Sequence, residues 1–232
     1  MDQLPLADRA YDVLMVEFMS GALRPGDRLK IDTVARKLGI SHTPVREALV
    51  RLEQTGFVER QARRGYVVAR LLDSSEMAQL MDARLAMEPA MAALAATRGD
   101  ENFLGSLRST IETMNRADDT PGGEALIGCW LADEAFHTLI AERSGNRFMA
   151  QAYRSLGGQL QRFRIISGAG VSHARAASQE HQRIFAAIAG GSGEDARAGM
   201  VTHLENARAR ALADLERAAV RLDAQEDGRP HG

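Results

Sequence analysis

The apolar positions of the first 70 residues follow a helical period and then a strand period. Helical spacing predicts three short helices: one within residues 6–23, a second capped by Asp32 and closed by Gly39, and a third with Thr43 as N-cap and Pro44 in its first turn. The buried stripe of the third helix is expected to comprise Val45, Ala48, Leu49 and Leu52. Residues 57–60 and 66–68 then read as two strands around a turn. This order predicts a winged helix-turn-helix.

From residue 73 onward, the apolar spacing is helical and no strand signal returns. Glycine and proline clusters divide this stretch into six expected helices, at about 74–97, 101–117, 122–143, 146–167, 172–189 and 194–222. We therefore expect a mainly α fold. It would consist of a winged helix-turn-helix DNA-binding domain (1–72), an all-α six-helix antiparallel bundle (73–224) and a flexible tail (225–232).

Ionisable side chains interrupt the apolar faces of three of these helices. Asp133 and His137 share one stripe, His181 lies at the middle of another, and His203 lies at the border of a third. A buried ionisable group is costly unless a partner satisfies it, and one divalent ion would satisfy all four side chains. Three imidazoles and a carboxylate suit zinc, with nickel as an alternative.

These polar residues also have simpler interpretations. A single inward histidine is more often a hydrogen-bonded core residue than a ligand, although the group together favours a metal. Arg84, on the stripe of the helix at 74–97, either pairs with Glu88 one turn away or offers its guanidinium fork to the carboxylate of a small organic acid. Glu134 forms a Glu-x-x-His motif with His137, but no second copy follows, which argues against a di-iron site. Glu180 is expected at the surface or behind the ligands.

The charge of the chain is unevenly distributed. The net charge is −2, yet residues 36–70 carry eight basic and three acidic side chains, a local excess of +5. This excess favours a polyanionic partner such as DNA, although exposed charges are more often simply solvated. The single cysteine, Cys129, fits a reducing compartment, and no apolar run is long enough for a membrane span. We expect a cytoplasmic protein without membrane contact.

Two sets of residues resemble a known protein family. The first set is Gly39-Ile40-Ser41-His42-Thr43-Pro44-Val45-Arg46-Glu47-Ala48-Leu49, Leu52, Gly56 and Arg64-Gly65-Tyr66-x-Val68. The second set is Arg84-x-x-x-Glu88, Asp133-x-x-x-His137, Ser144-Gly145-Asn146, Glu180-His181 and His203-Leu204. The first resembles the GntR family of bacterial transcription regulators, and the second resembles its FadR-type C-terminal (FCD) ligand-binding domain. Six expected helices place the chain nearer the shorter, VanR-like branch. His42 stands where the family usually has arginine.

The resemblance implies a homodimeric transcription regulator, usually a repressor, and not an enzyme. It implies a divalent metal bound by Asp133, His137, His181 and His203, with a small carboxylate effector beside it. Arg84 and Glu88 are the candidate effector-binding residues. The candidate contacts to a double-stranded operator, expected to be an inverted repeat, are Ser41, His42, Thr43, Arg46, Arg63, Arg64 and Gly65.

Two other classes of protein remain open at this point. One is a metal-dependent hydrolase or lyase with a DNA-binding appendage, for which Glu134 or Glu88 would have to act as the general base. The other is a purely structural helical dimer, in which the buried polar cluster secures packing without any metal.

Overall fold

The structure is a computed structural model that describes residues 5–62, 64–118, 123–167 and 173–227. The chain divides into two compact units, one made of residues 1–71 with 155–166 and the other of residues 72–154 with 167–232. Among the described helices, none combines the length and the apolar character that a bilayer crossing requires.

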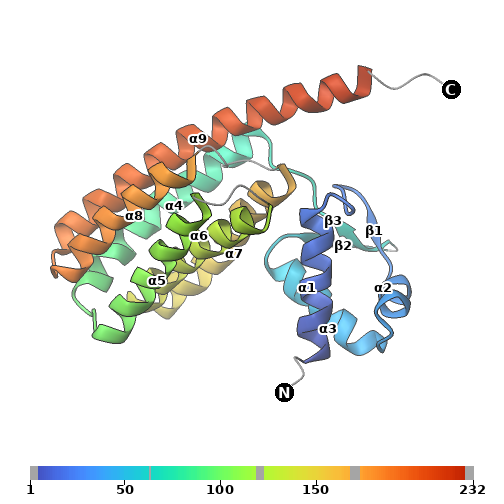
Figure 1. The fold of residues 1–232 in the computed structure, drawn as a ribbon, viewed down its shortest axis with the longest axis horizontal. Helices are drawn as coiled ribbons and strands as arrows, with labels where there is room; N and C mark the ends of the chain where they lie inside the picture. The colour runs from blue at the N-terminus through green and yellow to red at the C-terminus, as the bar shows by residue number, and fades with distance from the viewer. Residues whose placement is uncertain (1–4, 63, 119–122, 168–172, 228–232) are drawn as a thin grey trace. The chain divides into compact units, whose positions relative to one another are not determined.

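The N-terminal elements form a winged helix-turn-helix (Figure 1). They are α1 (Leu6–Met19), β1 (Arg28–Leu29), α2 (Ile31–Leu38), α3 (His42–Gln54), β2 (Val58–Gln61) and β3 (Gly65–Val68). The strands form an antiparallel sheet in the order β1-β3-β2, in which Tyr66 lies opposite both Leu29 and Arg60. Strand β1 was not predicted, because two residues are too few to show an alternating pattern.

Helices α2 and α3 are joined by a turn that requires glycine. Gly39 follows α2 with φ 65° and ψ 32°, a left-handed conformation that a residue without Cβ adopts at little cost. The predicted apolar stripe of α3 is fully buried, and it consists of Val45, Ala48, Leu49 and Leu52. The sequence therefore predicted correctly both the turn and the face that α3 packs inward.

The predicted starts of these two helices were each wrong by two residues. Helix α2 begins before Asp32, which lies inside the first turn and is not the N-cap. Helix α3 begins at His42, with Ser41 at the N-cap, so Thr43 also lies inside the helix. Neither N-cap side chain accepts a hydrogen bond from the helix backbone. The prediction assumed that a capping side chain sets the start, and here none does.

The second part of the chain contains the six predicted helices (Figure 1). They are α4 (Ser74–Ala96), α5 (Glu101–Asp118), α6 (Gly123–Arg143), α7 (Arg147–Ser167), α8 (Ala174–Ala189) and α9 (Gly193–Asp227). Helix α9 continues past its predicted end to Asp227, so residues 225–227 of the predicted tail are helical, while residues 228–232 lie outside the described part. These elements confirm the predicted fold class.

Helices α4, α6, α8 and α9 enclose the core in which the polar residues lie. Helix α4 packs against α6, α8 and α9, while α8 packs against α9 and α5. Gly199 permits a close approach of α9 to α8, because a Cβ at this position would lie 3.3 Å from Cγ1 of Ile184. His203 lies one turn after Gly199 on α9, and His181 lies one turn before Ile184 on α8.

Candidate metal centre and nucleic-acid interface

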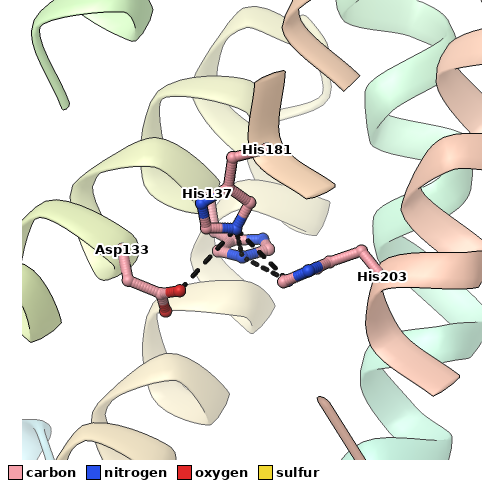
Figure 2. A group of neighbouring side chains, drawn as sticks. All are labelled: Asp133, His137, His181 and His203. Carbon is pink, nitrogen blue, oxygen red and sulfur yellow. Dashed lines mark hydrogen bonds and ion pairs between the residues drawn. The ribbon is translucent and has the colours of Figure 1, made fainter. Parts of the chain in front are cut away.

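Four buried side chains from three helices converge inside the bundle. Asp133 and His137 lie on α6, His181 on α8 and His203 on α9. One ligand atom from each lies within 4.8 Å of all the others, and Figure 2 shows the side chains pointing toward one another. His203, which the sequence left at the border of its stripe, is only 1% exposed. The structure thus brings together the four side chains that the helical pattern singled out.

The three imidazole rings turn the same nitrogen inward. The Nε2 atoms of His137 and His203 lie 3.2 Å apart, and each lies 3.3 Å from Nε2 of His181. Oδ1 of Asp133 lies 3.7 Å from Nε2 of His181. Three nitrogens bound to one zinc ion at tetrahedral angles would be about 3.3 to 3.4 Å apart. The triangle therefore has the dimensions of a metal-binding site.

The outer nitrogens of the three rings determine where their protons lie. The contacts are His137 Nδ1 to Glu88 Oε2 at 2.6 Å, His203 Nδ1 to Glu180 Oε2 at 2.7 Å and His181 Nδ1 to Met114 Sδ at 3.2 Å. An ionised carboxylate can only accept, and a thioether is a weak acceptor, so the neutral tautomer that suits these contacts carries its proton on Nδ1. Three Nε2 lone pairs then face one another without a proton between them. A cation among them would remove this repulsion.

An arginine holds each of the two carboxylates behind the rings. Arg84 donates from Nε to Glu88, and Arg210 donates to both oxygens of Glu180 at 2.9 and 2.8 Å. Burial by itself would raise the pKa of both carboxyl groups. Against this, the charge of Arg84 beside Glu88, and the hydrogen bonds from Arg210 and His203 to Glu180, hold each pKa at about 2. Both groups are therefore ionised acceptors at neutral pH.

Of the two interpretations of Arg84, the structure shows the pair with Glu88. The guanidinium is 1% exposed, and although burial works to lower its pKa, the charge of Glu88 raises it. The guanidinium makes one hydrogen bond, from Nε to Glu88, and its Nη1 and Nη2 groups have no hydrogen-bond partner among the described residues. A buried guanidinium with unpaired donors is costly.

Both carboxylates that could serve an enzyme as a general base, Glu88 and Glu134, accept hydrogen bonds from other side chains. Glu88 accepts from Arg84 and His137. Glu134 accepts at 3.2 Å from the hydroxyl of Tyr153, and burial raises the pKa of both Glu134 and Tyr153. Sequence reasoning missed Tyr153, which lies at an ordinary inward position of α7 and carries no motif.

The candidate DNA-binding residues of α3 lie on its exposed side. Ser41, His42, Thr43 and Arg46 are all exposed, opposite the buried stripe. The exposed His42 also has a neighbour of opposite charge type, because its Nε2 lies 3.2 Å from Oδ1 of Asp32. A short helix with one buried face and one exposed polar face has the form that a major groove accepts.

The hairpin between β2 and β3 provides the second part of this interface. Arg64 and Gly65 are exposed, and Gly65 has a positive φ of 77°, which suits glycine at the start of β3. The third predicted contact at the tip, Arg63, lies outside the described residues.

Comparison with known protein families gives two matches, in the order of the two modules. Residues 6–68 match the family model described as bacterial regulatory proteins, gntR family, and residues 79–206 match the FCD domain. The FCD match alone spans more than half of the chain. All four residues of the candidate metal centre lie within it.

Curated relatives are similar over most of their length. LutR, an HTH-type transcriptional regulator of Bacillus subtilis, is 28% identical over 208 residues, which cover 81% of this chain and 92% of LutR. GlaR, an HTH-type transcriptional repressor of Escherichia coli, is 26% identical over 157 residues, or 67% of this chain and 71% of GlaR. A regulator from Streptomyces ambofaciens is 32% identical over 183 residues, covering 78% of this chain and 75% of the relative.

Solved structures share the fold. McbR/YncC of E. coli superimposes with a TM-score of 0.71 at 21% identity, covering 90% of this chain and 98% of that protein. A GntR transcriptional regulator from Rhodococcus sp. RHA1 gives a TM-score of 0.67 at 23% identity, covering 89% and 97%.

Proposed function

Because the chain belongs to the GntR family of bacterial transcription regulators and carries an FCD domain after its DNA-binding module, we propose that it is a metal-containing regulator whose DNA affinity responds to a small organic acid. The family and its relatives are regulators, not enzymes. The proposal concerns the metal, the effector, the operator and the oligomeric state.

The observation that carries the metal proposal is the set of three inward Nε2 atoms, which lie 3.2 to 3.3 Å apart. Asp133 would supply the fourth ligand. The donor set fits a borderline divalent ion, with zinc first and nickel second. When bound, such an ion supplies a Lewis-acidic position that a carboxylate oxygen can occupy.

The charge of the buried cluster supports an anionic effector. Asp133, Glu88 and Glu180 carry three negative charges and Arg84 and Arg210 balance two of them, so these five groups sum to −1. Burial raises the pKa of the neighbouring Glu134, which disfavours its charged form. A divalent ion changes this charge to +1. A buried net charge is unfavourable, so a carboxylate from outside would be stabilised there. The Nη groups of Arg84 are the donors best suited to bind it, and its pair with Glu88 keeps the guanidinium in position.

For DNA, we propose a homodimer that binds an inverted repeat, with its two α3 helices in successive major grooves about 34 Å apart. Arg46 would contact a guanine edge, while the other candidates of α3 and of the hairpin would hold phosphates. In the family such proteins are usually repressors. We propose the same role here, in the cytoplasm.

Elemental analysis of the purified protein tests the metal centre. We expect one divalent ion per chain in the wild type and none in His181→Ala, with both proteins folded by circular dichroism. His173→Ala is the matched control, because it removes an imidazole that lies outside the cluster. A metal-free wild type with a stable fold would favour the purely structural interpretation.

Titration calorimetry with acetate, lactate, succinate and citrate tests the effector site. We expect at least one of these acids to bind the metal-loaded wild type, and we expect Arg84→Lys to bind it at least about tenfold more weakly, because lysine keeps the charge and loses the fork. Binding of unchanged affinity in Arg84→Lys and in His181→Ala would contradict the proposed site.

A further inference from the structure

We propose that Glu180, held in place by Arg210 and Asn206, is a positioning residue that directs the lone pair of His203 toward the metal and thereby sets how tightly the ion is bound. This inference rests on the metal site proposed above.

The hydrogen bonds around Glu180 use both of its oxygens fully. Oε2 accepts from His203 Nδ1 at 2.7 Å and from Arg210 Nη2 at 2.8 Å. Oε1 accepts from Arg210 Nη1 at 2.9 Å and from Asn206 Nδ2 at 2.9 Å. The side chain is 8% exposed, so water does not compete freely for these bonds. Four donors are thus satisfied by one carboxylate.

The donors come from one face of a single helix. His203, Asn206 and Arg210 lie on α9 at positions i, i+3 and i+7, which stack along one stripe, whereas Glu180 lies on α8. Arg210 and Asn206 therefore fix the carboxylate from the same helix that carries the ligand. A rotation of the His203 ring would break a short charge-assisted hydrogen bond.

The chemistry requires a carboxylate at this position. A carboxylate has acceptor oxygens on both sides, and so it can serve His203 and Arg210 at once. Glutamine has one acceptor oxygen, which the charged Arg210 would take, leaving the amide N–H₂ group facing Nδ1 of His203. That ring nitrogen would then have to accept, its proton would move to Nε2, and the lone pair would no longer face the ion.

The other two histidines are held differently. His137 has Glu88 behind it, and Arg84 supports this carboxylate through one hydrogen bond from Nε. Nδ1 of His181 lies 3.2 Å from the thioether of Met114. A carboxylate behind a ligating histidine raises the basicity of the ligand. Glu180 accepts four hydrogen bonds from described residues and Glu88 accepts two, so of these two carboxylates the one behind His203 is held more firmly.

Metal competition against a chromophoric chelator, with zinc and with cobalt, tests the proposal on the full chain. We expect Glu180→Gln to raise the Kd for zinc by about 10- to 100-fold and Arg210→Lys to raise it by a smaller factor. The matched controls are Glu205→Gln and Arg197→Lys, which make the same changes at exposed positions of α9 and should leave the Kd unchanged.

Nitrogen-15 NMR of the metal-free proteins separates positioning from a general loss of stability. We expect His203 to be protonated on Nδ1 in the wild type and to shift toward the Nε2-protonated tautomer in Glu180→Gln, while Glu205→Gln stays like the wild type. A zinc Kd and a His203 tautomer that are both unchanged in Glu180→Gln would overturn the positioning role. A wild type that binds neither ion would instead overturn the proposed metal site, and the positioning role with it.

Discussion

Arg84 illustrates what a buried charge requires of the residues around it. Its guanidinium is almost fully buried, and Glu88 neutralises it while also accepting a hydrogen bond from His137. Such a pair adds little net stability compared with an apolar pair of equal size, but loss of one partner leaves the other charged and desolvated. The pair therefore matters more for the arrangement of the candidate metal ligands than for the total stability of the bundle.

A double-mutant cycle tests this interpretation at the residue scale. We expect Arg84→Met to lower the free energy of unfolding by about 3 to 5 kcal/mol, and the double variant Arg84→Met with Glu88→Leu to lower it less. Urea unfolding measures both. Arg154→Met, which removes an exposed partner of Glu142, should cost less than about 1 kcal/mol. Equal losses for the buried and the exposed arginine would contradict the interpretation.

The two kinds of DNA contact can also be separated residue by residue. Arg46→Ala should relax the sequence preference, with a loss of about 1 to 3 kcal/mol that is confined to the specific site, because a bidentate guanine contact is removed. Arg63→Ala should weaken binding to all sequences alike, because a phosphate contact carries no sequence information. Footprinting on an operator and on unrelated DNA measures both effects. No change for either variant would refute the assignment.

At the scale of elements, the distance between α8 and α9 determines whether His181 and His203 can share an ion. Gly199 lies against Ile184 at this contact, one turn from the ligand on each helix. Glycine inside a helix costs up to about 1 kcal/mol relative to alanine, so close packing is the physical advantage that it offers here. The helices can approach because this position has no side chain.

A larger residue at this position should therefore weaken the metal site. We expect Gly199→Leu to lower the free energy of unfolding by about 1 to 3 kcal/mol through overpacking, and to raise the Kd for zinc because the two histidines move apart. Ala198→Leu, on the exposed side of α9, is the control and should change neither quantity. A zinc Kd in Gly199→Leu equal to that of the wild type would show that the helix spacing does not limit the site.

Most of the helices and strands could be predicted, because the spacing of apolar residues and the positions of glycines can be read directly from the neighbouring sequence. The six helices of the bundle and the turn at Gly39 follow from such signals. The sequence placed Glu180 at the surface or behind the ligands, but it did not show which residues Glu180 contacts. Glu180 lies 100° from His181 around the helix, and only the packing of α8 on α9 brings it to His203 and Arg210. The spacing of residues along one helix gives no information about a hydrogen-bond partner on another helix.

At the scale of the whole molecule, the proposed metal joins helices that are distant in the sequence, and so its binding should stabilise the folded state. An ion at 100 times its Kd adds about 2.7 kcal/mol to the free energy of unfolding. We expect EDTA to lower the Tm of the wild type, zinc to restore it, and neither to affect His181→Ala. An identical Tm with and without the chelator in the zinc-loaded wild type would contradict the site.

The order of the ligands along the chain has a consequence for biosynthesis. Asp133 and His137 emerge from the ribosome first, His181 follows, and His203 comes only with α9, after every other helix that forms the core. A nascent chain cannot present all four ligands until α9 has been made and has packed against α8. A transcript cut short before α9 would still encode the winged helix-turn-helix. Its product would lack His203, one of the four residues of the candidate metal centre.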